Sequence, residues 1–195
     1  WGSSTVTPNG RSGDKPQVLE HKSAIFWMTG RGLSAHTACF ARQHYLQGNL
    51  MSSMHRTLAD FVKDCRGISD TDCAAADCVQ ALVPVMFDLV ARADDFLSES
   101  HRQSDPSGYC RNLIYETDDG SLSLYSLVWL PGQWTPVHDH GSWGVVGVVE
   151  GNLEERSYVR TDDHHGRDEG IALSRGGIVL LPPGAVTTFV PNPDH

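Results

Sequence analysis

Seven short apolar runs in the C-terminal half of the chain constrain its fold more than any other feature of the sequence. After the loop-forming segment 104–108 (SDPSG), the hydrophobic period changes from about 3.6 to about 2 residues, and Gly, Pro and Asp bound each run. Short strands without intervening helices are typical of an antiparallel sandwich or barrel. We therefore predict a mainly β fold with strands at 110–116, 121–130, 143–150, 153–160, 171–173, 178–181 and 186–190.

The segment 57–98 shows a helical period instead. Apolar residues at 58–65 recur on one helix face, and a second apolar stripe follows at 79–90. Pro84 must lie in the first turn of the second helix or kink it. We expect the two helices to form an N-terminal layer beside the β structure.

Residues 1–50 differ from the rest of the chain, and we interpret them as a poorly structured N-terminal extension. They open with a polar, turn-rich run, and the remainder of the segment shows neither a sustained helical nor an alternating period. The chain starts at Trp1 while Met51 opens the regular part, so residues 1–50 could also precede the natural start. Residues 51–195 are predicted to be one domain.

Composition excludes several classes of partner. The formal net charge of -9 argues against nucleic acid, and the apolar stretch 24–28 is too short for a membrane span or a signal-peptide core. The five cysteines are odd in number and fit no zinc-ribbon or thioredoxin spacing, which indicates free thiols in a reducing compartment. We expect a soluble, cytoplasmic protein; the sequence does not fix its oligomeric state, and a monomer is favoured.

Two histidines one residue apart are the main candidate for chemistry. On a β-strand, His138 and His140 would project to the same face while Asp139 points away, so the pair could chelate one metal ion. Surface histidines on a strand are a common alternative. Gly132 and Gly151, which flank the pair, favour the metal interpretation because they bound a strand, turn, strand unit.

The stretch "GQWTPVHDHGSWGVVGVVEG" (132–151) resembles the first motif of the cupin superfamily, with one departure. Gly144 stands where most metal-binding cupins have a glutamate ligand. Without that carboxylate, a divalent ion keeps its full charge and open positions, which favours a soft anionic ligand such as a thiolate. Iron(II) can hold thiolate and dioxygen side by side, whereas zinc has no redox chemistry.

A closer resemblance is to the cysteine dioxygenase branch of the cupins. The segments 127–158 and 109–115 ("YCRNLIY") carry it, and it extends over roughly 57–195. It implies a cupin fold, a small antiparallel barrel or jelly roll, with iron(II) on three histidines. It also implies that Arg111 binds the substrate carboxylate and that Tyr109 assists.

The same resemblance bears on the substrate. An arginine at the place of Arg111 goes with cysteine and a glutamine with 3-mercaptopropionate, although "PGQWTPVHDHGSWG" (131–144) is more like the bacterial mercaptopropionate type. A surface salt bridge is the other interpretation of Arg111.

The third histidine is harder to locate. The generic second cupin motif fits Gly176, Pro182 and Gly184 but has Thr187 where histidine belongs. The dioxygenase spacing puts the family's aspartate at His195 and its histidine about two residues later. Three interpretations stay open: a ligand beyond residue 195 in a truncated domain, which we favour, a degenerate site, or His195 itself as a ligand beside His138 and His140.

The sequence therefore predicts an iron(II)-dependent enzyme that adds dioxygen to a small thiol, with cysteine to cysteine sulfinate favoured. The alternatives are a 3-mercaptopropionate dioxygenase and a non-catalytic cupin that binds a metal or a small ligand. The expected partners are a small thiol and O2.

Overall fold

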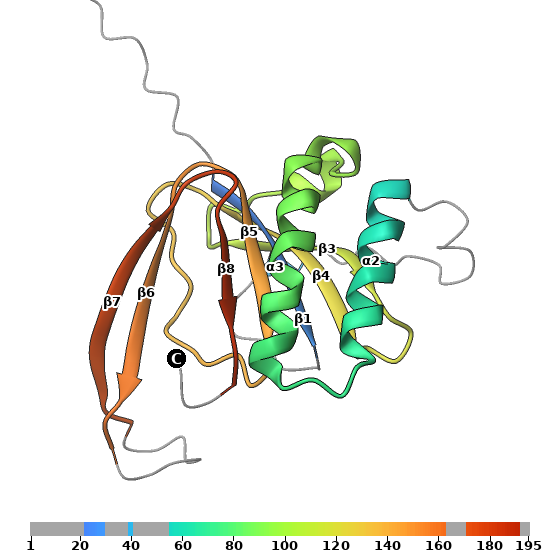
Figure 1. Cartoon of the computed structure of the whole chain (residues 1–195). Coiled ribbons are helices and arrows are strands. Elements are labelled where there is room, and N and C mark those ends of the chain that lie inside the picture. Colours follow the sequence, from blue (N-terminus) through green and yellow to red (C-terminus); the bar gives the residue numbers. More distant parts are fainter. Residues whose placement is uncertain (1–21, 30–38, 41–54, 163–170, 192–195) are drawn as a thin grey trace, which may run out of the picture.

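The computed structural model describes residues 22–29, 39–40, 55–162 and 171–191 (Figure 1). Six strands form one sheet in the order β2-β3-β4-β1-β5-β8, and β6 and β7 form a second sheet of two strands. The strands are β1 (Lys22–Thr29), β2 (Cys39–Phe40), β3 (Cys110–Glu116), β4 (Leu122–Trp129), β5 (Gly144–Glu150), β6 (Leu153–Arg160), β7 (Leu173–Leu181) and β8 (Val186–Phe189). The helices are α2 (Arg56–Ser69) and α3 (Ala75–Ala91), with the 3-10 turns η1 (Ala93–Asp95) and η2 (Glu99–Arg102).

The mainly β, cupin-type fold with a helical layer is confirmed, and the predicted strands from 110 to 160 fall within a residue or two of those observed. The runs predicted at 171–173 and 178–181 join into one strand, β7. The glycines between them interrupt the apolar pattern but not the extended backbone, since Gly177 N donates to Ser157 Oγ of β6 over 2.9 Å. Pro84 lies inside α3.

The prediction that residues 1–50 hold little fixed structure is wrong for Lys22–Thr29. This strand, β1, lies between β4 and β5 and pairs antiparallel with both. Six consecutive residues of β1 are buried, so side chains on both faces of this strand are covered. Such a strand has no alternation of apolar and polar residues, so its sequence carries no period-2 signal. The segments 1–21, 30–38 and 41–54 lie outside the described residues.

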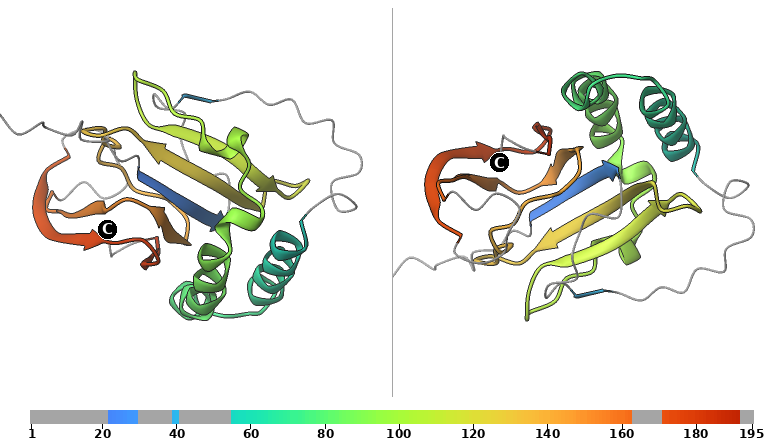
Figure 2. Two further views of the ribbon diagram at one scale, coloured as in Figure 1. Left: turned by 90° about the horizontal axis from the view of Figure 1, so that it is seen from above. Right: turned by 90° about the horizontal axis from the view of Figure 1, so that it is seen from below.

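One face of the large sheet packs against α2 and α3 (Figure 2). Ile25 and Trp27 of β1 point into this core, where the ring of Trp27 meets the ring of Phe61 edge-on at a centroid distance of 5.4 Å. Gly147 of β5 lets α3 approach closely, because a Cβ at this position would overlap the side chain of Val90. The two helices thus cover one face of the large sheet, and the opposite face carries the second apolar cluster, around Phe26 and Leu127.

Two long arms, β5 with β6 and β7 with β8, bend sharply away from the sheet (Figure 1). The bend lies at Gly151 in the first arm and Gly184 in the second, and both glycines have positive φ, 69° and 85°. Residues with a side chain rarely adopt a positive φ, which explains why glycine stands at both positions. The arms stay paired across the bend, where Gly184 N donates to Val148 O over 2.8 Å. Because of these bends, the paired strands pass from the large sheet into the β6–β7 sheet, as in a jelly roll.

The cysteines differ from the prediction of free thiols. Cys73 and Cys78 form a disulfide in the connection from α2 to the first turns of α3. Cys65 is a buried free thiol, and Cys110 of β3 is also buried. The odd count concealed this pair, because spacing alone cannot show which cysteines approach each other. In the part of the chain that the structure describes, no helix is long and apolar enough to cross a membrane.

Candidate functional site

His138 and His140 lie in the connection between β4 and β5, which has no regular secondary structure from 130 to 143. The expectation that they sit on a strand is therefore wrong. The loop nevertheless brings their rings together, with centroids 4.8 Å apart and planes at 62°. His138 is exposed and His140 half-buried.

A backbone carbonyl orients the ring of His138. Its Nδ1 lies 2.6 Å from the carbonyl oxygen of Pro136. A carbonyl can only accept, so Nδ1 carries the proton and Nε2 keeps the lone pair. Metal-binding histidines are usually held in this way, which fixes both the tautomer and the ring orientation. His138 is thus prepared to bind a metal through Nε2.

Aromatic side chains hold the ring of His140. Phe189 of β8 stacks on it with a centroid distance of 4.0 Å, and Phe26 of β1 lies 5.4 Å away at an interplanar angle of 27°. Phe26 and Phe189 also stack on each other at 5.0 Å. The loop histidine therefore packs against two strands of the large sheet.

Arg111 lies on β3 with only 7% of its surface exposed, and its Cζ lies 4.6 Å from the ring centroid of Tyr125 on β4. Such burial argues against an exposed surface salt bridge. Tyr109, just before β3, stacks on Trp129 with a centroid distance of 5.9 Å. A buried guanidinium keeps its charge, so it is suited to bind a carboxylate.

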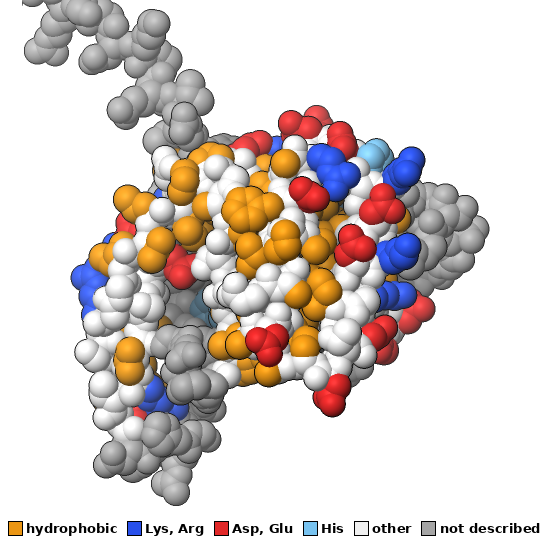
Figure 3. All heavy atoms as spheres, in the orientation of Figure 1, with side chains coloured by type: hydrophobic (Ala, Val, Ile, Leu, Met, Phe, Trp, Pro, Cys, Tyr) orange, Lys and Arg blue, Asp and Glu red, His pale blue; other side chains and the backbone are white. Residues whose placement is uncertain are grey.

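The strand register places these groups on one face of the sheet. Arg111 pairs with Leu127, and Phe26 pairs with both Tyr125 and Val146. Residues opposite each other in a ladder share a face, and Leu127 and Phe26 belong to the same apolar cluster on the face away from the helices. Figure 3 shows a hollow between the β6–β7 sheet and β8, with a histidine side chain in it. The predicted substrate residues and the His140 packing residues thus line the same side of the molecule.

Two imidazoles, one oriented by a carbonyl, fit a divalent transition metal. Among the described residues, no third His, Cys, Asp or Glu completes a metal-binding group with them. His195 lies outside the described residues. Thr187 of β8 occupies the place of the generic cupin histidine. Desolvation raises the pKa of Glu155 of β6, and the hydroxyl of Thr187 opposes this shift more weakly.

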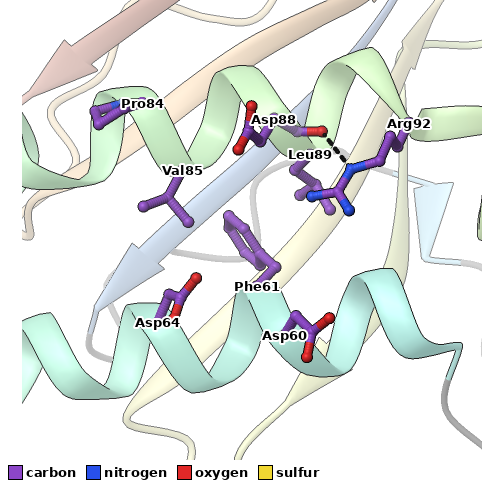
Figure 4. Close-up of a pocket in the computed structure, with 8 residues that line it drawn as sticks. All are labelled: Asp60, Phe61, Asp64, Pro84, Val85, Asp88, Leu89 and Arg92. Atoms are coloured by element: carbon purple, nitrogen blue, oxygen red, sulfur yellow. Dashed lines mark hydrogen bonds between the residues drawn. The ribbon is translucent and has the colours of Figure 1, made fainter.

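A cavity of about 140 Å³ lies elsewhere, between α2 and α3 (Figure 4). Its floor is apolar, with Phe61 and Leu89, and the carboxylates of Asp60, Asp64 and Asp88 stand around it. It contains no histidine and is on the opposite side of the sheet from Arg111. We therefore do not assign the chemistry to it.

Sequence reasoning missed Phe26 and Phe189, which pack on His140. Phe26 lies in the segment for which the sequence predicts little fixed structure. Phe189 lies on β8, which the strands β6 and β7 separate from the metal motif in the sequence. The register that joins β5 to β8, with Gly144 opposite Phe189, is what brings Phe189 to the site. No local sequence signal encodes that pairing.

Comparison of the sequence with known protein families identifies the family of the chain. The sequence model of cysteine dioxygenase type I matches residues 46–172, which include Tyr109, Arg111, His138 and His140. No solved structure matches the chain. The match spans well over half of the 195 residues. The chain belongs to the cysteine dioxygenase type I family.

Proposed function

We propose that the protein is an iron(II)-dependent dioxygenase that converts cysteine to cysteine sulfinate. Membership of the family supports thiol dioxygenase activity in general. The observation that carries the finer proposal is a histidine pair in which a carbonyl binds Nδ1 of His138, with no carboxylate at Gly144, on the side of the sheet where Arg111 is buried. This set suits a metal that must take an anionic thiolate and still keep a position for dioxygen.

In this proposal His138 and His140 bind iron through ring nitrogens, with His195 as the candidate for the third ligand. Iron(II) supplies the one-electron chemistry that the slow direct reaction of a thiol with dioxygen lacks. The Pro136 carbonyl keeps the proton of His138 on Nδ1, so Nε2 is available without a loss of a proton. The loop residue His140 is held by packing.

Arg111 binds the carboxylate of the substrate. Its guanidinium can donate two parallel hydrogen bonds to the two oxygens, and burial strengthens the attraction. Tyr125, over which the guanidinium lies, restricts its movement. Holding the carboxylate fixes the thiol relative to the histidine pair, which brings the reacting atoms together. The thiol and one O2 give the sulfinic acid, with both oxygen atoms on sulfur.

Oxygen uptake by the iron-loaded full chain tests the proposal. We expect uptake with cysteine, and less with 3-mercaptopropionate at equal concentration. His138→Ala should abolish it, whereas His101→Ala, a matched change at η2 away from the site, should not. His195→Ala should abolish uptake only if His195 is the third ligand.

Two outcomes would contradict the proposal. Absence of uptake with either thiol at full iron loading would favour the non-catalytic, metal-binding alternative. Faster uptake with 3-mercaptopropionate would overturn the assignment of cysteine while leaving a thiol dioxygenase.

A further inference from the structure

Gly144 and Phe189 face each other across the ladder of β5 and β8. A Cβ built on Gly144 would overlap the ring of Phe189 at Cζ and the carbonyl oxygen of Trp27. The ring of Phe189 thus occupies the space into which a side chain at 144 would project. An aromatic ring therefore occupies the space that the glutamate ligand of other cupins would need at position 144.

Among the residues that the structure describes, the same ring is the nearest aromatic partner of His140, at a centroid distance of 4.0 Å and an interplanar angle of 26°. Phe26 supports it from β1, with centroids 5.0 Å apart and planes within 16°. His140 comes from a loop, so its backbone alone does not restrict the ring to one orientation. Packing of a ligand by rigid neighbours supplies that restriction.

We propose that Phe189 is a positioning residue for the metal site: it holds the His140 imidazole in its ligating orientation and excludes a protein carboxylate from position 144. The inference rests on the proposed function in taking His140 as a metal ligand. The two histidines are then held by different means, His138 by a hydrogen bond to Pro136 and His140 by stacking.

The geometry predicts a signature that needs no metal and no turnover. Protons of the His140 ring lie over the face of Phe189, so the ring current should move their NMR signals upfield. The His140 signals can be assigned among the ten histidines by their loss in His140→Gln. Phe189→Leu should abolish the upfield displacement, and Phe189→Tyr, which keeps the ring, should retain it.

Metal affinity gives the second readout. Loss of a group that orients a metal ligand commonly costs about 10- to 100-fold in affinity. We expect the Kd for zinc to rise by about 10-fold in Phe189→Leu and to recover in Phe189→Tyr. Phe87→Leu is the matched control, because Phe87 lies on α3 with 48% of its surface exposed. Phe189→Met, also without a ring, replaces Phe189→Leu if circular dichroism shows that the leucine variant is unfolded.

The inference is overturned if the His140 signals of the unaltered protein show no upfield displacement, or if the ringless variants bind zinc as tightly as the unaltered protein. Zinc has no redox chemistry. Weaker zinc binding in Phe189→Leu together with no oxygen uptake by the iron-loaded protein would therefore support the positioning role and contradict only the proposed reaction.

Discussion

The guanidinium of Arg111 lies over the ring of Tyr125, with Cζ 4.6 Å from the ring centroid. The two residues come from neighbouring strands, β3 and β4, and Arg111 is buried. A cation over an aromatic face is attracted by the ring quadrupole, by about 2 kcal/mol when water is excluded. Tyr125 thus contributes to the orientation of the group that we assign to substrate binding.

Replacing Tyr125 should weaken substrate binding without removing the arginine. We expect Tyr125→Leu to raise KM for cysteine by roughly 5- to 30-fold, which corresponds to about 1–2 kcal/mol. Tyr125→Phe keeps the ring and should change KM by less than about 2-fold. Steady-state oxygen uptake measures both. Equal effects of the two variants would show that the ring contributes nothing through Arg111.

Removing the arginine should act through the substrate carboxylate. Arg111→Ala should raise KM for cysteine by roughly 10- to 100-fold, because a hydrogen bond to a charged group contributes about 1.5–3 kcal/mol. Cysteamine has the same thiol and amine but no carboxylate, so its KM should hardly change. An equal rise in KM for cysteine and for cysteamine would indicate that Arg111 acts through packing and not through the substrate carboxylate.

The contact between α3 and β5 predicts a stability difference between two glycines. Gly147→Ala would place a Cβ against Val90 and Met86, and we expect it to lower the free energy of unfolding by about 1–3 kcal/mol. Gly67 lies in α2 with no atom near its Cβ position, so Gly67→Ala should raise it by up to about 1 kcal/mol. Urea unfolding with the same substitution at both positions checks this, and two effects of one sign would contradict it.

His101 should make stability depend on pH. Burial lowers its pKa below the ordinary value of 6.5, and its neutral Nδ1 accepts the N–H of Ser98 at the start of η2. The unfolded chain therefore binds the proton more readily. The stability that the neutral ring contributes is present above pH 6.5 and is lost as the pH falls through the lowered pKa.

The His101 effect is measured by urea unfolding between about pH 8 and about pH 5. His101→Gln should make the free energy of unfolding fall less steeply over this range than in the unaltered protein. The slope is compared because the substitution also changes the cap of η2 at every pH. An unchanged slope would assign the acid sensitivity to other groups.

Periodicity predicted most of the fold, because the strands from β3 onward and both helices each bury one face or lie between clear turn residues. It failed at β1, since a strand buried on both faces shows no alternation. It also divided β7, where Gly176 and Gly177 hide a continuous strand.

The sequence indicated the histidine pair and Arg111 through their motifs, and the structure brings the two rings close and buries the arginine. It could not indicate Phe26 or Phe189, whose positions depend on the pairing of β1 and β8 with β5. Gly144 shows the difference best. The sequence showed a missing ligand there, and the structure shows what occupies its space.

Mass spectrometry of the product formed from cysteine under ¹⁸O2 by the iron-loaded full chain tests the proposed reaction most directly. We expect cysteine sulfinate with both oxygen atoms labelled, formed by the unaltered protein and not by His138→Ala or His140→Ala. Cystine as the sole product, or a sulfinate carrying unlabelled oxygen from water, would contradict it.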